Sequence, residues 1–217
     1  MAGWSARPAA RPDRDRALHD KYASFSELAR HEVAGLDYRI TSRERPRSSV
    51  LVMAPHGGSI EIGTSELAAL IAGEEHSLFS FEGLKAHGRN RDLHITSHNF
   101  DHPLCLELAA RCAVTLGVHG CSGEAQIFIG GLDLILSGLL VRELAAHGLP
   151  ACADGHRYPG RHPFNICNRS RRGRGAQLEI TKDLRDPEGR ARIAHAVRSV
   201  LDTYKPGRVI SNWNEIV

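Results

Sequence analysis

The sequence predicts a single-domain α/β fold, built on a mixed, mostly parallel sheet with helices on both of its faces. Short apolar runs of strand length alternate with amphipathic segments of helix length, which is the pattern of a sheet covered by helices. The chain has 217 residues, enough for one substantial core but few for two independent domains. We therefore expect one domain over residues 19–217. A disordered basic arm is expected over residues 1–18, where arginine, alanine and proline follow no period.

The predicted elements alternate along the whole domain. The strand candidates are apolar runs at 37–41, 49–55, 76–82, 93–97, 113–120, 126–130 and 177–181. The helix candidates are amphipathic segments at 22–34, 64–73, 104–112, 132–147 and 187–204. Thr64 is the expected N-cap of the second helix, and Pro187 and Glu188 are both favoured in the first turn of the last helix.

Composition and charge narrow the classes of protein to consider. No segment approaches the roughly 20 apolar residues of a membrane-spanning helix, and the N-terminus lacks the apolar region of a signal peptide, so we expect a cytoplasmic protein without a membrane partner. The five cysteines form no C-x-x-C pair, which argues against a disulfide framework or a cysteine-rich zinc finger. A formal net charge of +3 suits an anionic substrate but is small for a nucleic-acid-binding protein.

A candidate metal site begins where the apolar run at 49–55 ends. His56 follows that run, and Gly57 and Gly58 separate it from Glu61. The two glycines allow the backbone to turn tightly, so that Glu61 can return to the position of His56. Ligands of α/β proteins gather at the carboxyl ends of strands. We therefore expect His56 and Glu61 to share one metal ion.

His119 ends the apolar run at 113–120 in the same way and is again followed by glycine. If the two runs are neighbouring parallel strands, their terminal histidines converge. Catalytic zinc usually has three protein ligands, such as two imidazoles and one carboxylate, and a fourth position that is open to water. The sequence thus predicts a zinc site formed by His56, Glu61 and His119, at which the metal activates water and polarises a carbonyl.

Glu179 is the candidate general base. In the run at 177–181 it lies near the middle of a strand, on the face opposite Leu178 and Ile180. A charged residue in that position is costly unless it faces a polar cleft. We therefore expect Glu179 to take up and return the proton during catalysis, with Glu82 as the next carboxylate to test.

Seven segments occur in an order that resembles a known family. They are HGGSIEIGTSELA, SFEG, LHITSHNFD, VHG, GGLD, NICNR and QLEIT, within residues 22–204. This ordered set resembles the phage-type poly-γ-glutamate hydrolase family, zinc enzymes whose fold is similar to that of carboxypeptidase A. The resemblance implies that His56, Glu61 and His119 hold zinc and that Glu179 is the catalytic glutamate, the same four residues as above.

The resemblance also indicates residues that bind substrate. Arg169 and Asn168 belong to the NICNR segment, and carboxypeptidase-like enzymes use an arginine as a bidentate clamp on a substrate carboxylate. His94, in the LHITS run, is expected to line the cleft. The alternatives are a solvated loop for Arg169 and a structural role for His94.

Two functions follow from these observations. The first is a zinc-dependent amidohydrolase that cleaves γ-glutamyl bonds in poly-γ-glutamate or a related acidic peptide. The second is a metal-free, phage-derived nucleic-acid-binding protein, which is suggested by the basic arm and the arginines of loop 169–174. Binding to single-stranded nucleic acid also needs aromatic residues among the basic ones, and that loop has none. The hydrolase accounts for more of the residues.

Overall fold

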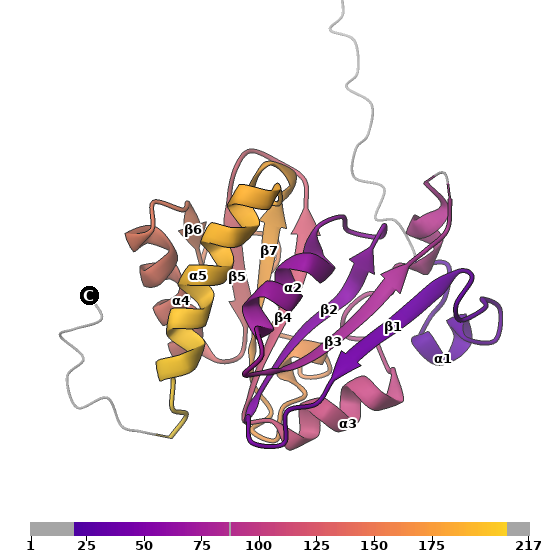
Figure 1. Cartoon of the computed structure of the whole chain (residues 1–217), viewed down its shortest axis with the longest axis horizontal. Helices are drawn as coiled ribbons and strands as arrows, with labels where there is room; N and C mark the ends of the chain where they lie inside the picture. The colour runs from indigo at the N-terminus through magenta and orange to yellow at the C-terminus, as the bar shows by residue number, and fades with distance from the viewer. Residues whose placement is uncertain (1–19, 87, 208–217) are drawn as a thin grey trace, which may run out of the picture.

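The chain forms the predicted α/β fold (Figure 1). The computed structural model describes residues 20–86 and 88–207. The predicted basic arm at 1–18, residue 19 and the segment 208–217 therefore lie outside the described residues. Within them a single seven-stranded sheet, with helices packed on both faces, accounts for the core.

The sheet is mixed, with a parallel centre. Its strands lie in the order β1-β3-β2-β4-β7-β5-β6. The four central strands, β3, β2, β4 and β7, are parallel neighbours, whereas β1 pairs antiparallel with β3 and β5 pairs antiparallel with β7. The strand bounds are Tyr38–Arg43 (β1), Val50–Gly58 (β2), Ser77–Gly83 (β3), Val114–Cys121 (β4), Ile127–Gly131 (β5), Ala151–Cys152 (β6) and Ala176–Thr181 (β7).

Three helices cover one face of the sheet, and α3 lies on the other (Figure 1). No helix within the described ranges combines the length and the apolar character that crossing a bilayer requires. The α-helices are α1 (Phe25–Leu28), α2 (Thr64–Ala72), α3 (Pro103–Arg111), α4 (Leu134–Ala146) and α5 (Pro187–Thr203), and the first face carries α2, α4 and α5. Three short 3-10 helices are η1 (Arg89–Leu93), η2 (Ile166–Asn168) and η3 (Lys182–Leu184).

Strand β2 is buried on both of its faces. Val50, Val52 and Ala54 pack into the core beneath α2, α4 and α5. Leu51 and Met53 pack into the second core, on the side of α3. A strand with both faces covered needs apolar residues at every position, which is why this segment is a continuous apolar run.

The segment 93–97 is not the strand that the sequence predicts. Leu93 ends η1, and His94–Ser97 form a loop. Leu93 and Ile95 are both buried, so the alternation typical of a strand is real. However, the backbone groups here bind side chains instead of a neighbouring strand: Ile95 O accepts from His56, and Thr96 N–H donates to Asp20.

Three smaller differences concern the element ends. The helix predicted at 22–34 is limited to Phe25–Leu28, because the chain then turns and carries Glu32 into the interior. Thr64 is the first helical residue and not the N-cap, which is Gly63 in a left-handed conformation. Strand β6 was not predicted, since two residues are too few to show a period.

A buried ionic cluster fastens the N-terminal segment to the domain. Glu32 accepts hydrogen bonds from Tyr22 and Lys21 and forms an ion pair with Lys85. The side chains of Glu32 and Lys85 are only 5% and 6% exposed. Burial would raise the pKa of Glu32, but the hydrogen bonds from Lys85, Tyr22 and Lys21 lower it to about 2. Glu32 is thus ionised and depends on these donors.

Replacing Lys85 tests this cluster. Lys85→Ala should lower the free energy of unfolding by roughly 3 kcal/mol, the low end of the range for breaking a buried pair, because Lys21 still compensates Glu32. Chemical denaturation measures the change. Arg111→Ala is the control, since its pairs with Glu44 and Glu107 are exposed and such pairs contribute little. Equal losses in both variants would contradict the assignment.

Candidate metal centre and active-site cleft

The position of His56 depends on an irregularity in strand β2. The parallel register with β3 shifts between Ala54 and Gly57, and Pro55 and His56 lie within this shift. Proline has no backbone N–H for the ladder, so a bulge is the usual way to accommodate it. Bulges next to active sites re-aim side chains. His56 accordingly lies near the carboxyl end of β2, inside the strand and not after it as the sequence suggested.

The tight turn after His56 brings Glu61 back to it, as expected. The backbone N–H of Glu61 donates to the carbonyl of His56 over 2.9 Å. Gly58 has a positive φ of 61°, and a Cβ atom there would lie 2.7 Å from the carbonyl oxygen of Gly83. Only glycine fits this turn. The Thr64 hydroxyl donates to the Glu61 carbonyl over 2.8 Å, which fixes the far end of the turn.

The sheet register places His119 beside two of the other candidates. Strand β4 pairs in parallel with β2 on one side and with β7 on the other. In the second pair His119 is the register partner of Glu179. Register partners on neighbouring strands project to the same face of a sheet, so His119 and Glu179 reach the same cleft.

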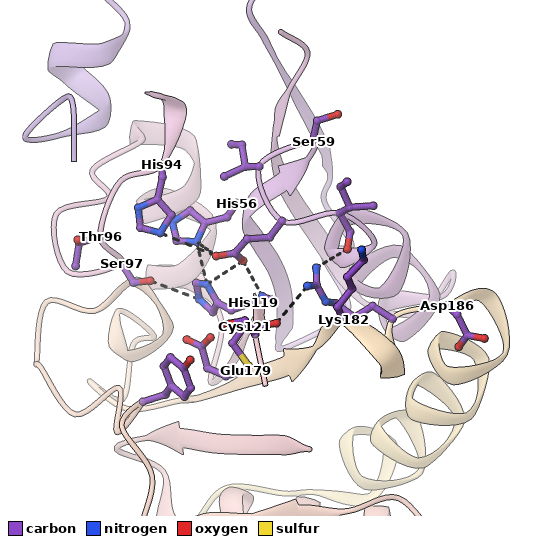
Figure 2. Close-up of a pocket in the computed structure, with 17 residues that line it drawn as sticks. His56, Ser59, His94, Thr96, Ser97, His119, Cys121, Glu179, Lys182 and Asp186 are labelled. Atoms are coloured by element: carbon purple, nitrogen blue, oxygen red, sulfur yellow. Dashed lines mark hydrogen bonds and ion pairs between the residues drawn. The ribbon is translucent and has the colours of Figure 1, made fainter. Parts of the chain in front are cut away.

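The three predicted metal ligands converge, and Figure 2 shows the rings of His56 and His119 close together in the cleft. Nδ1 of His56 lies 3.0 Å from Oε1 of Glu61 and 3.1 Å from Nδ1 of His119. Nδ1 of His119 lies 3.7 Å from Oε2 of Glu61. The donor atoms of all three residues lie within 4.8 Å of one another.

The donor set fits a zinc ion. Nε2 of His56 donates to the carbonyl of Ile95 over 2.7 Å, so loss of the other ring proton would leave the lone pair of Nδ1 facing the other ligands. Such a second hydrogen bond fixes the tautomer of metal-binding histidines. Nε2 of His119 lies 3.5 Å from the Ser97 hydroxyl, and Oε2 of Glu61 accepts from Gly120 N–H over 2.7 Å. Two facing imidazole nitrogens and a carboxylate are a set that a cation stabilises.

The ionisation of these groups follows from burial and mutual charge. Burial would raise the pKa of Glu61, but the charge and hydrogen bond of His56, together with His119, lower it to about 2. Burial lowers the pKa of His119 to about 3, against the opposing charge of Glu61. An ionised carboxylate and a neutral imidazole are the forms that bind a metal.

Glu179 has the opposite electrostatic environment. Burial, and then the negative charge of Glu61, raise its pKa well above the ordinary value for a glutamate. Its carboxylate accepts a hydrogen bond from the Gln177 side chain over 3.2 Å. Two carboxylates in one site whose pKa values are driven apart are typical of acid–base pairs with separate roles.

These residues open into a cleft of about 900 Å³. His94 lines it, with its ring centroid 4.1 Å from that of His56. Positive charge on His56, followed by burial, lowers the pKa of His94. The cleft wall also includes Lys182 and Arg185, which follow the end of β7.

Arg169 and Asn168 do not line this cleft as the structure describes it. Arg169 lies against the ring of Phe164, with Cζ 5.4 Å from its centroid. Asn168 is buried; its amide donates to the carbonyls of Gly160 and His162 and accepts from the N–H groups of Leu132 and Gly175. These partners occupy the amide completely. The hydrogen bonds of Asn168 thus connect the segments around Gly160, Leu132 and Gly175. Substrate binding by Asn168 and Arg169 stays a prediction from the sequence.

Three residues of the cleft region were missed by reasoning from the sequence. Lys182 and Arg185 could have been found, because they directly follow a strand whose carboxyl end was already assigned to the site. Asp20 could not. It bonds to His94, 74 residues away, and no local pattern marks it. Glu82, the alternative base, forms an ion pair with Arg39 and is not part of the described cleft wall.

The fold and the cleft together define an α/β protein with a candidate metal site at the carboxyl ends of its parallel strands. The family model for poly-gamma-glutamate hydrolase matches residues 22–191. The chain therefore belongs to the poly-gamma-glutamate hydrolase family, and this membership supports a hydrolase.

Individual relatives agree with this membership. UPF0714 protein YmaC of Bacillus subtilis (strain 168) is 39% identical over 170 residues, which cover 77% of this chain and 71% of YmaC. The solved structure of a bacteriophage poly-gamma-glutamate hydrolase matches with a TM-score of 0.78 and 29% identity, over 84% of this chain and 96% of that one. A zinc-free apo structure of YndL matches with a TM-score of 0.79 and 34% identity, over 85% and 98%.

Metal analysis tests the candidate centre. The purified wild-type chain should bind about one zinc ion, and His56→Ala or His119→Ala should remove most of it, because each variant leaves two of three protein ligands. Elemental analysis after dialysis against a weak chelator measures the content. His98→Ala is the control, since that exposed histidine packs on His162. Full zinc content in both ligand variants would contradict the site.

Proposed function

We propose that this chain is a zinc-dependent amidohydrolase that cleaves γ-glutamyl amide bonds in poly-γ-glutamate or a related acidic peptide. The observation that carries the proposal is the convergence of His56, Glu61 and His119 beside the partly buried Glu179 in one open cleft. Membership of the poly-gamma-glutamate hydrolase family supports the substrate class. A cytoplasmic location stays a prediction from the sequence.

Each residue of the site has a separate part in this proposal. His56, Glu61 and His119 would hold zinc, which supplies Lewis acidity, making water a stronger acid and polarising a carbonyl. Glu179 takes a proton from the attacking water at its carboxylate and returns it to the amide nitrogen that leaves. Burial raises the pKa of Glu179 from its ordinary value, which is the direction a general base needs, because such a base works best with a pKa close to the operating pH.

Recognition of an acidic chain is better supplied by Lys182 and Arg185 than by Arg169. Each γ-linked glutamyl residue carries a free α-carboxylate, and both cations line the cleft. The guanidinium of Arg185 is fixed by hydrogen bonds to the carbonyls of Ile62 and Cys121. It lies directly against Gly120, where a Cβ atom would come within 2.4 Å of Nη1. Arg185 is therefore held rigidly next to the metal ligands, as a carboxylate clamp requires.

The nucleic-acid alternative gains no support from the arginine loop. Arg172 forms an ion pair with the buried Asp133, with 2.7 Å between Nη1 and Oδ2, and Arg169 packs on Phe164. These contacts give two of the four loop arginines structural partners within the domain.

Carboxylate-to-amide substitutions separate the catalyst from the ligand. Glu179→Gln should keep its zinc while turnover falls by at least roughly 10²–10⁴-fold, the contribution of general acid–base catalysis. Glu61→Gln should lose zinc, because a neutral amide replaces a charged oxygen ligand. Zinc content and cleavage of poly-γ-glutamate are measured on both variants. If Glu179→Gln cleaves at a near-normal rate, the base is misassigned.

The cleft cations should distinguish acidic from neutral substrates. Lys182→Ala should raise KM for poly-γ-glutamate roughly five-fold, the effect of one exposed charge pair, with little change for a γ-linked amide that lacks the α-carboxylates. Arg185→Lys should change KM in the same direction. Arg169→Ala is the matched control and should affect both substrates alike. An equal change on both substrates in Lys182→Ala would contradict the clamp but leave the hydrolase assignment intact.

A further inference from the structure

Asp20 links the start of the described chain to the wall of the cleft. Its carboxylate lies 2.7 Å from Nδ1 of His94 and accepts the backbone N–H of Thr96 over 2.6 Å. The side chain is only 12% exposed. Burial would raise the pKa of Asp20, but the hydrogen bonds to His94 and Thr96 lower it to about 2. Both of its oxygens therefore act as acceptors for groups that flank Ile95, the carbonyl partner of His56.

The residues that follow Asp20 have anchoring contacts of their own. The next residue, Lys21, pairs with the buried Glu32, and Tyr22 is buried with its hydroxyl on Glu32. These contacts fix the chain directly after Asp20. A carboxylate presented from such a fixed segment orients its partner, instead of following it.

The two ring nitrogens of His94 face different partners. Nδ1 donates to Asp20, and Nε2 lies 4.0 Å from Oε1 of Glu61, at the cleft. The ring also packs over that of His56, at an interplanar angle of 31°. With Nδ1 committed to Asp20, the neutral ring offers Nε2 as a hydrogen-bond acceptor to whatever occupies the cleft.

We propose that Asp20 is a positioning residue, which holds His94 in the Nδ1–H tautomer so that Nε2 accepts a hydrogen bond from an amide N–H of the substrate. A polyamide chain offers such a donor at every bond. The proposal rests on the proposed amidohydrolase function for its substrate, but the tautomer of His94 can be measured without one.

The substitution Asp20→Asn keeps the shape of the side chain but changes its hydrogen bonds to His94 and Thr96. An asparagine has one acceptor oxygen, whereas His94 and Thr96 both donate to Asp20. If the amide oxygen stays on Thr96, its NH₂ group faces Nδ1, and the ring must move its proton to Nε2 to accept from it. Nε2 would then be a donor, in conflict with a substrate N–H. Asp20→Glu keeps two acceptor oxygens and serves as the conservative variant.

The experiment uses the full chain loaded with zinc, with poly-γ-glutamate as the probe. Ring ¹⁵N chemical shifts report the His94 tautomer, and zinc content, kcat and KM are measured in parallel. We expect Asp20→Asn to keep its zinc, to move the His94 proton from Nδ1 to Nε2, and to lose roughly 10–100-fold in kcat/KM, as for other residues that orient a functional histidine. Asp20→Glu should retain the Nδ1–H tautomer and recover part of the activity.

Asp92→Asn is the matched control, because it changes the same charge two residues from His94 and removes only an exposed contact with Lys21. It should leave both tautomer and activity near wild type. A His94 proton that stays on Nδ1 in Asp20→Asn, or that moves equally in Asp92→Asn, would overturn the proposal. So would a tautomer change without loss of kcat/KM. If the wild-type chain does not cleave poly-γ-glutamate, the proposed function fails, whereas the ¹⁵N measurement still decides how Asp20 acts on His94.

Discussion

The parallel pairing of β4 with both β2 and β7 is the constraint on which the site depends. Through it, one strand presents His119 to His56 on one side and to Glu179 on the other. Parallel strands all point their carboxyl ends to the same edge of the sheet, so side chains from distant parts of the sequence meet there without any long loop. The rigid backbone ladder then fixes their separation, which is what preorganised chemistry requires.

Burying three ionisable groups at that edge is costly unless each is hydrogen-bonded. The chain meets this requirement with backbone groups: Ile95 supplies a carbonyl to His56, and Gly120 supplies an N–H to Glu61. This use of the backbone explains why residues 94–97 form a loop beside a well-ordered sheet. Their carbonyl and N–H groups already serve the side chains of the site, and Asp20 completes the arrangement.

The ionisable groups of the cleft differ in their charge state. Glu61 is held ionised by the histidines, whereas Glu179 has a raised pKa because it is buried near that same negative charge. Lys182 and Arg185 add positive charge on the wall that follows β7. Under the proposed function, the cations would attract an anionic chain while Glu179 exchanges a proton with the reacting groups.

The α/β class, most of the strands and helices, and the four residues that meet in the cleft could be predicted from the sequence. Strand-end histidines, a double glycine and a carboxylate in an alternating run are local patterns. They can be recognised in a sequence because the spacing of residues follows the period of the secondary structure. Other features depend on contacts that form only in the folded chain. Residues 93–97 alternate like a strand but form the end of η1 and a loop, Arg169 packs on Phe164, and Asp20 reaches His94 across 74 positions. Each of these depends on which distant partner satisfies a polar group or covers an apolar one, and such pairings arise only when the chain is folded.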